Sequence, residues 1–362
     1  MSTPRLSIGL LFGGESPEHE VSIVSARSIA QNLDAERFDV QPIGIAKNGV
    51  WLVNGDPFAR LAAGELPERG TSPYSPLEKG AEDLVLPDVF FNAIHGAFGE
   101  DGRLQGYLDM LKRPYTGAGL LGMAAGMDKW VAKLVWASSG IPQVPYVGLT
   151  EEAWTREADV LREKVLALGL PVFVKPANAG SSIGIRKVKE AAELDDAIAF
   201  ALAYDRRVVV EKGVDAREIE VAVLGGDDPL VSVPGEVHVA GEFYDFNDKY
   251  LDGKSWTETN AKLPEATRER IRAHAREAFR SIDAFGLARV DFFVEHSTGD
   301  VYLNEVNLIP GFTNISMYPK LMESVGVPYG ELLTRLVDLA LERHRQGASK
   351  KKGFESGSDW FA

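Results

Sequence analysis

The feature that most restricts the fold of this chain is the repeated alternation of short apolar runs with longer helical patterns. Residues 6–12 form an apolar run that ends in two glycines, and a helical pattern opens just after Ser16 and Pro17, residue types that favour the first turn of a helix. Further strand patterns follow at residues 38–45 and 89–95. This spacing predicts a doubly wound α/β unit with a parallel sheet in the first hundred residues.

Composition limits the class of protein. With 362 residues and 45% hydrophobic residues, the chain can bury substantial cores, and its length predicts two or three domains. No apolar run reaches about 18 residues and no signal-peptide pattern is present, so we expect a cytoplasmic protein without membrane association. The absence of cysteine excludes disulfides, thiolate zinc sites and a cysteine nucleophile. A formal charge of −14 argues against binding to nucleic acid.

The later segments indicate two further units. A long helical pattern at residues 119–140 leads out of the first unit, and strand patterns at residues 218–225 and 230–239 precede a charged helix at residues 264–285. The last residues are polar and rich in lysine and serine, which predicts a flexible tail. We expect the domains to span residues 1–120, 121–213 and 214–346, with a tail at 347–362.

The sequence "RVDFFVEHSTGDVYLNEVN" at residues 289–307 predicts a hairpin with an acid on each arm. Centring the turn on Thr298 pairs Asp291 with Glu305 and Arg289 with Asn307, and because the side-chain period of a strand is two, all four project from one face. The opposite, apolar face would carry Val290, Phe292, Val294, Tyr302 and Val306.

A bare pair of opposed carboxylates destabilises a sheet by about 0.2 to 1 kcal/mol, so this face needs a cation. Arg289 can supply it, which would make the face an ordinary solvated surface. A metal is the alternative: carboxylate and amide oxygens without histidine or cysteine suit Mg²⁺ or Mn²⁺, and two ions can share such ligands. The residues alone leave both interpretations open.

A candidate anion-binding loop lies in "PVFVKPANAGSSIGI", where a strand ends at Lys175 and a loop with Gly180, Ser181, Ser182 and Gly184 follows. Glycines let backbone amides approach an anion, hydroxyls add donors, and lysine adds a point charge for nucleotide phosphates. An ordinary surface loop is the alternative, because the sequence is not a Walker A motif.

Downstream, "VVVEKGVDAREIEV" indicates a buried strand that delivers Glu211 and Lys212, and a second strand with Glu218. Such paired polar groups can bind an adenine edge and ribose hydroxyls. A strand end followed by a solvated turn is the common alternative.

Six segments in order resemble the ATP-grasp superfamily and, within it, the D-alanine-D-alanine ligase family: "GGESPEHEVS", "HGAFGEDGRLQGYLDM", "PYTGAGLLGMAAGMDK", "VKPANAGSSIG", "EFYDFNDKY" and "NEVNLIPGFT". The resemblance covers residues 6–339. It implies a three-domain architecture in which an α/β domain binds substrate and two α+β domains enclose ATP.

The resemblance also implies roles for individual residues. Phosphates would be bound by Lys129, Lys175, Gly180 and Ser182, adenine by Glu211, Lys212 and Val214, and ribose by Glu218. Two Mg²⁺ or Mn²⁺ ions would be held by Asp291, Glu305 and Asn307. Gly213 departs from the bulky residue that the family sometimes carries, which leaves the adenine contacts less defined.

The implied reaction forms an acylphosphate from one D-alanine and ATP, and the amine of a second D-alanine then attacks it. Arg289 and the amide of Gly311 would stabilise the oxyanion, Glu20 would bind the first ammonium, and the second carboxylate would meet Lys249, Ser316 and Met317. His95 would lie near the first substrate, and Tyr250, Ser181 and Glu20 would fasten a lid at residues 242–260. For Glu20 the alternative is a helix-dipole contact, and for His95 a neutral structural role.

Rival functions differ in the motifs they need. The spacing of Gly9, Gly13 and Gly14 fails the dinucleotide fingerprint, which argues against a dehydrogenase. A non-catalytic binding module would not need the acidic hairpin together with the phosphate loop. A D-alanine-D-lactate ligase would share nearly every motif. The expected partners are ATP and D-alanine, in a homodimer.

Overall fold

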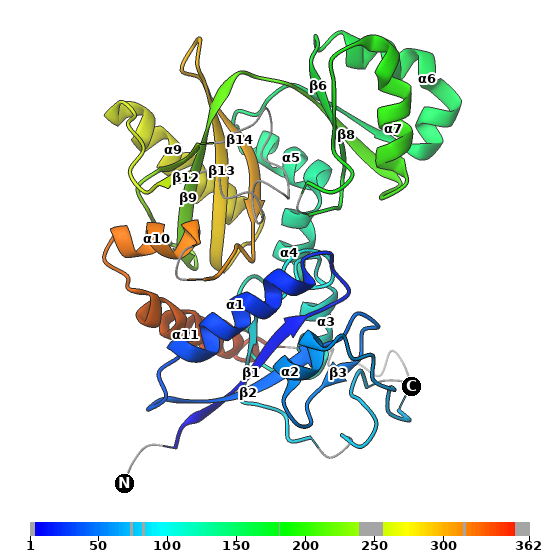
Figure 1. Ribbon diagram of the computed structural model, residues 1–362. Helices are drawn as coiled ribbons and strands as arrows, with labels where there is room; N and C mark the ends of the chain where they lie inside the picture. The colour runs from blue at the N-terminus through cyan, green and yellow to red at the C-terminus, as the bar shows by residue number, and fades with distance from the viewer. Residues whose placement is uncertain are drawn as a thin grey trace, which may run out of the picture.

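Three sheets organise the chain in the computed structural model, which describes residues 4–72, 75–81, 84–180, 182–238, 256–313 and 316–351 (Figure 1). The first sheet contains β1 (Leu6–Gly13), β2 (Phe38–Ile45), β3 (Trp51–Leu52) and β4 (Val89–Asn92) in the order β3-β2-β1-β4. β1 is parallel to β2 and β4, and β3 is an antiparallel edge. The predicted parallel α/β unit is therefore confirmed.

Helices cover both faces of this first sheet, because its central strand is apolar on both sides. Ile8 and Leu10 of β1 belong to the core that includes α1 (His19–Asn32), and Leu11 belongs to the core that includes α3 (Arg103–Met110). The segment after α1 leads to β2, and Glu18, directly before α1, is buried.

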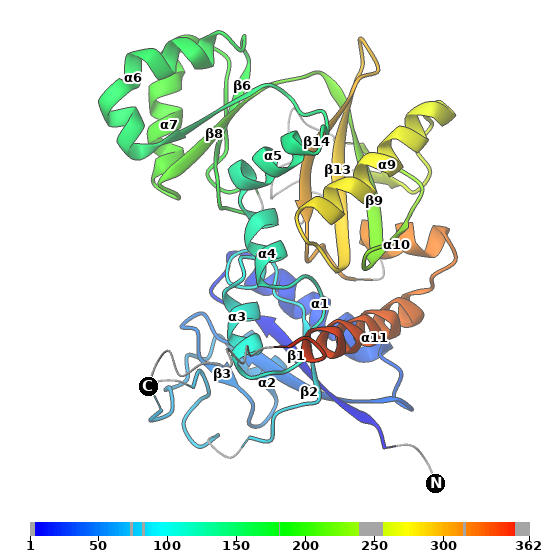
Figure 2. The same ribbon diagram turned by 180° about the vertical axis from the view of Figure 1, so that it is seen from behind.

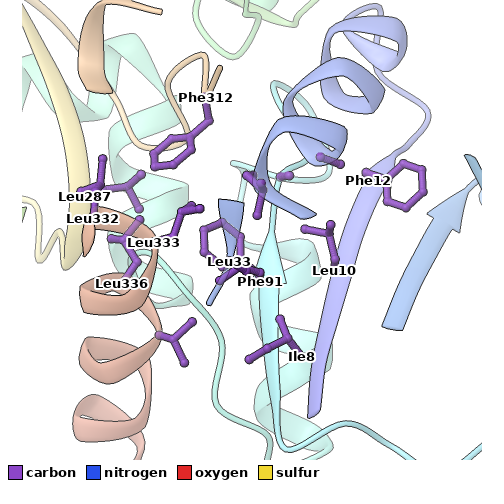
Figure 3. Packing of buried hydrophobic residues seen from close by; sticks show 14 of the residues in the cluster. Ile8, Leu10, Phe12, Leu33, Phe91, Leu287, Phe312, Leu332, Leu333 and Leu336 are labelled. Carbon is purple, nitrogen blue, oxygen red and sulfur yellow. The ribbon is translucent and has the colours of Figure 1, made fainter. Parts of the chain in front are cut away.

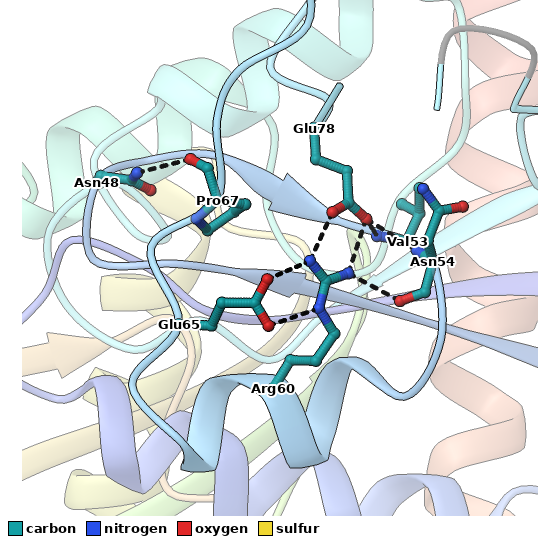
Figure 4. Close-up of polar contacts among 7 residues, drawn as sticks. All are labelled: Asn48, Val53, Asn54, Arg60, Glu65, Pro67 and Glu78. Carbon is teal, nitrogen blue, oxygen red and sulfur yellow. Dashed lines mark hydrogen bonds and ion pairs between the residues drawn. The ribbon is translucent and has the colours of Figure 1, made fainter. Parts of the chain in front are cut away.

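Arg60 on the short helix α2 (Pro57–Ala62) fixes the segment between β3 and β4 (Figure 4). Its guanidinium donates to Glu65, to Glu78 and to the carbonyl of Asn54 at 2.6–2.9 Å. Burial favours the neutral form of Glu78, but hydrogen bonds from Arg60 and from two backbone amides outweigh it and lower the pKa of that carboxyl.

The helical pattern at residues 119–140 is two helices, α4 (Leu120–Met127) and α5 (Lys129–Ser138), so the prediction of one long helix is wrong. Asp128 between them has extended backbone angles, and its side chain accepts a hydrogen bond from the amide of Val131. An aspartate that caps a new helix interrupts the preceding one. The break directs α5 toward the second sheet (Figure 1).

The second sheet is antiparallel, with the order β5 (Tyr146–Thr150), β8 (Arg207–Lys212), β6 (Val172–Pro176) and β7 (Arg186–Val188). The helices α6 (Glu151–Leu166) and α7 (Leu194–Leu202), with the short 3₁₀ turn η1 (Ala191–Glu193), cover one face. Val208 and Val210 pack toward these helices. Since side chains alternate along a strand, Glu211 projects from the other face, toward α5.

The third sheet has the order β12 (Trp256–Glu258), β11 (Gly235–His238), β9 (Ala216–Gly225), β13 (Gly286–Glu295) and β14 (Val301–Asn307), with β10 (Leu230–Val231) against β9. Helix α9 (Glu265–Ser281) covers one face through Ile271, Ala275 and Phe279. None of the helices in the described ranges is long and apolar enough to cross a membrane.

The predicted hairpin register is confirmed where it matters for the site. Arg289 is paired with Asn307 and Asp291 with Glu305, but the register then shifts, so that Phe292 faces Leu303. Asn304 is thus the extra residue of a β-bulge. The bulge reverses the alternation beyond it, so the prediction that Tyr302 lies on the apolar face is wrong: Leu303 is fully buried there.

Two C-terminal helices, α10 (Met317–Ser324) and α11 (Tyr329–Ala348), return the chain to the first sheet (Figure 2). Leu332, Leu333 and Leu336 of α11 share one hydrophobic cluster with Leu33 and Phe91 of the first unit (Figure 3). Leu287 and Phe312 from the third unit join the same cluster. Helix α11, near the end of the chain, therefore completes the hydrophobic core of the first unit.

Candidate active site

A cavity of about 1000 Å³ lies where the three sheets meet. Residues from α1, the β4–α3 segment, α5, β6, β9, β13 and β14 line it. The candidate residues that line it are Glu20, His95, Lys129, Lys175, Gly180, Ser182, Glu218, Arg289, Asp291, Glu305, Asn307, Gly311, Ser316 and Met317.

Three of the described candidate residues stand apart from this lining. Glu211 is buried, Lys212 is exposed at the end of β8, and Val214 is half-buried after it, and these three do not line the cavity. Ser181, Lys249 and Tyr250 lie outside the described residues, as does most of the predicted lid.

The acidic hairpin face is built around Asp291. Arg289 donates to both oxygens of this carboxylate, from Nε at 2.8 Å and from Nη2 at 2.6 Å, and Asn307 Nδ2 donates to Asp291 Oδ2 at 2.8 Å. The same amide lies 3.5 Å from Glu305 Oε1. Burial alone would lower the pKa of Arg289, but the charges of Asp291 and Glu220 outweigh it and raise that pKa well above its ordinary value.

These side chains fit hard divalent cations. Two carboxylates and the amide of Asn307 share one face and line the cavity, and carboxylate and amide oxygens are ligands that such cations prefer. Glu220 of β9 is directly opposite Asp291 on the other neighbouring strand, and its Oε1 lies 3.3 Å from Arg289 Nε. Sequence reasoning did not single out Glu220, although its position two residues after Glu218 puts both on the same strand face.

Two lysines also line the cavity. Lys129 Nζ donates to the carbonyl of Ala179 at 2.6 Å, so it is anchored to the candidate phosphate loop. Lys175 Nζ lies 2.6 Å from Glu211 Oε2. Burial lowers the pKa of Lys129, whereas for Lys175 the charge of Glu211 outweighs burial and raises the pKa.

Glu211 is held between two lysines. Lys133 Nζ lies 2.9 Å from Glu211 Oε1, and the lysine side chain is 1% exposed. Burial favours the neutral acid, but the charges of Lys133 and Lys175 outweigh it and lower the pKa of Glu211 to about 2. Sequence reasoning missed Lys133, although lysines at positions 129 and 133 lie four residues apart and therefore share a helix face.

The loop after β6 needs its glycines for different reasons. Gly184 has a φ of +75°, and a Cβ there would lie 2.6 Å from Pro176 Cγ and 2.8 Å from Tyr204 Cδ2. A Cβ on Gly180 would lie 3.3 Å from Glu18 Oε2, at the cavity wall. Gly184 therefore shapes the loop, and Gly180 lets it approach α1.

Two glutamates of the first motif line the cavity at different depths. Glu20 is exposed and pairs with Lys47 at 2.7 Å, a hydrogen bond that lowers the pKa of Glu20. Glu18 is only 8% exposed, and its Oε2 would lie 2.5 Å from a Cβ on Gly96. Sequence reasoning chose Glu20, while Glu18 lies deeper and beside the phosphate loop.

His95 and Glu100 hold the backbone carbonyl and the backbone amide of Ile309 in the third unit. His95 Nδ1 lies 2.7 Å from the carbonyl oxygen of Ile309, and its Nε2 lies 2.8 Å from Ser25 Oγ. Glu100 accepts from the amides of Gly96 at 2.7 Å and Ile309 at 3.1 Å. Both ring nitrogens of His95 are engaged and burial lowers its pKa, which favours the neutral structural role.

Burial, and next the charge of Glu18, raise the pKa of Glu100 to about 8. Sequence reasoning did not select Glu100, because its burial depends on packing against Ile309, which is 209 positions away. Two residues after Ile309, Gly311 lines the cavity next to Ser316. The Oγ of Ser316 accepts a hydrogen bond from the amide of Thr313 at 3.1 Å. Together these contacts fix the segment that carries the expected oxyanion amide.

Comparison with known proteins is consistent across the whole chain. The family model described as "D-ala D-ala ligase N-terminus" matches residues 7–118, and the one described as "D-ala D-ala ligase C-terminus" matches residues 135–338. The D-alanine-D-alanine ligase of Chlorobium chlorochromatii is 46% identical over 363 residues, which cover 94% of this chain and 99% of the relative. That of Heliobacterium modesticaldum is 45% identical over 352 residues, with coverages of 94% and 96%.

Solved structures agree. The D-alanine-D-alanine ligase of Coxiella burnetii superposes with a TM-score of 0.78 at 34% identity and covers 96% of this chain and 97% of its own. A D-Ala:D-Ser ligase of Enterococcus faecalis gives a TM-score of 0.80 at 32% identity, with coverages of 93% and 100%. The two family regions together span most of the chain, and each of these curated relatives matches 94% of it; the chain belongs to the D-alanine-D-alanine ligase family.

Proposed function

We propose that the protein joins two molecules of D-alanine into D-alanyl-D-alanine through an acylphosphate and releases ADP and phosphate. The dipeptide would be used in the synthesis of peptidoglycan precursors. The observation that carries this proposal is the charge distribution of the cavity. The side chains of Asp291, Glu305 and Asn307 and the lysines Lys129 and Lys175 line the same cavity. Phosphoryl transfer needs such positioning and charge stabilisation more than covalent chemistry by the protein.

The proposed architecture is the three-domain ATP-grasp arrangement, with domains at residues 1–120, 121–213 and 214–346 and a tail at 347–362. Three sheets around one cavity support it. Helix α11, although late in the sequence, packs in the core of the first unit. We place the reaction in the cytoplasm, where ATP is available.

On the nucleotide side, Lys129, Lys175, Gly180 and Ser182 would receive the phosphates. A phosphate bound to Lys175 would compete with Glu211 for its positive charge, and Lys133 would remain as a second cation that keeps Glu211 charged. A charged Glu211 is an acceptor for an adenine amino group. Lys212, Val214 and Glu218 would complete the adenine and ribose contacts.

Two Mg²⁺ or Mn²⁺ ions, when bound to Asp291, Glu305 and Asn307, would offset the negative charge that gathers on the transferred phosphoryl group. The protein's own contribution at this face is orientation. Arg289 holds Asp291 from the side, and the pairing of β13 with β14 holds Glu305 and Asn307 in register.

On the amino-acid side, Arg289 and the amide of Gly311 would stabilise the oxyanion that forms when the amine attacks the acyl carbon. The first ammonium would meet Glu20 or the deeper Glu18, with His95 holding the neighbouring peptide of Ile309. The remaining expected contacts are Lys249, Ser316 and Met317 for the second substrate and Ser181 and Tyr250 for closure over it.

The second substrate is the finer question, because the relatives include a D-Ala:D-Ser ligase. Incubation with ATP, Mg²⁺ and D-alanine, alone or with D-lactate, D-serine or L-alanine, followed by mass spectrometry of the products, tests it. We expect D-alanyl-D-alanine as the main product in every mixture. A dominant mixed ester or a D-alanyl-D-serine product would assign the protein to another ligase of this family.

A homodimer is part of the proposal because the family resemblance implies it. Light scattering coupled to size-exclusion chromatography checks it directly. A mass near 39.5 kDa at micromolar concentration would contradict it.

A further inference from the structure

A second group of polar side chains lies on the other face of the strands that form the cavity wall. Glu236 and His238 are two residues apart on β11 and so project from one face. Glu258 of β12 is paired with Glu236. These three residues do not line the cavity, whereas Glu218, in register with the intervening Val237, does.

The polar atoms of these three side chains lie close together but too far apart for hydrogen bonds, as in an empty metal site. His238 Nε2 lies 3.7 Å from Glu236 Oε2 and 3.8 Å from Glu258 Oε2, too far for hydrogen bonds. One ligand atom from each of the three residues lies within 4.8 Å of the other two. His238 Nε2 is shielded from solvent and has no hydrogen-bond partner among the described residues.

The side chains are held in place by neighbours that are not part of the group. The imidazole of His238 stacks on the indole of Trp256, with ring centroids 3.7 Å apart and planes 12° apart. Arg217 donates to both oxygens of Glu236, from Nε at 2.8 Å and from Nη2 at 2.6 Å. Hydrogen bonds that orient a carboxylate in this way are typical of metal ligands.

Charge also favours a cation at this place. Glu236 and Glu258 are directly opposed on neighbouring strands, and opposed like charges are destabilising. Arg217 interacts electrostatically with both carboxylates, so a single guanidinium offsets two negative charges there.

We propose that Glu236, His238 and Glu258 form a binding site for a divalent transition metal of the zinc class, separate from the proposed catalytic ions. In a tetrahedral zinc site neighbouring ligand atoms lie about 3.4 Å apart, so small side-chain movements would close the 3.7 and 3.8 Å separations. Imidazole selects Zn²⁺, Co²⁺ or Ni²⁺ over Mg²⁺. Water would take the fourth position. The site would tie β11 to β12.

The test is a Co²⁺ titration of the full-length protein in excess Mg²⁺ and without nucleotide, followed by visible absorption. Zn²⁺ displacement of the bound Co²⁺ is measured in the same samples. We expect one saturable site, a tetrahedral-type spectrum, and affinity at least about tenfold weaker in both His238→Ala and Glu258→Gln, as for altered metal shells.

Two control variants separate this site from its surroundings. His296→Ala removes a neighbouring exposed histidine, and Asp291→Asn alters the proposed catalytic face; both should bind Co²⁺ as the wild type does. Unchanged Co²⁺ affinity in His238→Ala, or loss of the signal in Asp291→Asn alone, would overturn the proposal. Thermal unfolding of each variant without metal confirms that it is folded. Because the readout is metal binding, failure here leaves the ligase assignment untouched.

Discussion

At the scale of residues, the cavity is defined by ionisable groups whose burial differs sharply over short distances. Glu18 directly precedes α1 and Glu20 lies in its first turn, yet Glu18 is buried beside Gly180 and Glu20 is exposed beside Lys47. A buried carboxylate binds an ammonium more strongly than a solvated one does, because the dielectric is lower. Depth therefore distinguishes two candidates that have the same chemistry.

We predict that Glu18→Gln raises the KM for D-alanine by more than tenfold, on the order of the 1.5–3 kcal/mol of a charged hydrogen bond. Glu20→Gln is the matched variant, and its effect should be several-fold smaller because Glu20 is solvated. Initial rates of phosphate release at varied D-alanine measure both. A larger rise in the KM for D-alanine in Glu20→Gln would instead assign the binding of the ammonium to Glu20.

Lys133 is predicted to act through Glu211. Lys133→Met leaves a buried carboxylate with one lysine, a change that costs about 3–5 kcal/mol for buried pairs. We expect a lower melting temperature and a higher KM for ATP, with kcat changed less, because Lys175 would remain with Glu211 instead of binding phosphate. ATP titration by calorimetry checks the affinity directly.

The exposed Lys212 next to Glu211 offers the matched control. Lys212→Met should leave the melting temperature unchanged. Equal nucleotide affinity in the wild type and in Lys133→Met would show that Lys133 has no part in the binding of ATP.

The placement of a site residue could be predicted where it depends on local sequence pattern, but not where it depends on tertiary packing. The spacing of Asp291, Glu305 and Asn307 follows from strand period and could be predicted. Glu100 could not, because its burial depends on Ile309. Lys133 is a lysine inside a helix, and sequence alone favours an exposed position for it.

At the scale of elements, turns and irregularities determine where the site groups point. The bulge at Asn304 lies directly beside Glu305 and re-aims the end of β14 that lines the cavity. A constant register could be inferred from alternation, but the extra residue could not, because both registers leave apolar residues on a buried face. Asp128 similarly breaks a helical pattern whose composition remains apolar on both sides of it.

The phosphate loop yields a prediction that separates shape from contact. Gly184→Ala places a Cβ 2.6 Å from Pro176 at a positive φ, so it should lower the free energy of unfolding by at least about 1–2 kcal/mol and raise the KM for ATP. Gly180→Ala meets its nearest atom at 3.3 Å, so its stability should be close to that of the wild type while its KM values rise. Urea denaturation and steady-state kinetics measure the two effects; equal stability of both variants would contradict the account.

At the scale of the whole molecule, contacts far apart in sequence join the first and third units. Helix α11 completes the core beside Phe91 (Figure 3), and the backbone carbonyl and amide of Ile309 are held by His95 and Glu100. Such contacts cannot be predicted from periodicity, which indicates which face of α11 is apolar but not which sheet it covers. Domains defined as consecutive residue ranges therefore do not express the packing of α11 in the core of the first unit.

Glu100, at the contact between the first and third units, should make the free energy of unfolding depend on pH. Its pKa is raised from an ordinary value of 4.5 to about 8, so between these values the folded state binds more protons than the unfolded state. The free energy of unfolding therefore falls as pH rises across this window. We predict a smaller decline in Glu100→Gln, measured by urea denaturation from pH 5 to 8, with the exposed Glu163→Gln as control. Parallel pH profiles in the wild type and Glu100→Gln would contradict the prediction.

The central claim is that the hairpin face with Asp291, Glu305 and Asn307 and the cavity lysines form one site for ATP-dependent ligation of D-alanine. The most direct measurement is the yield of phosphate and of D-alanyl-D-alanine, with ATP and Mg²⁺, for the wild type and for Asp291→Asn. We predict equal amounts of the two products in the wild type, no phosphate without D-alanine, and nearly complete loss of both in a folded Asp291→Asn variant. Phosphate release without dipeptide, or wild-type turnover in Asp291→Asn, would contradict the account.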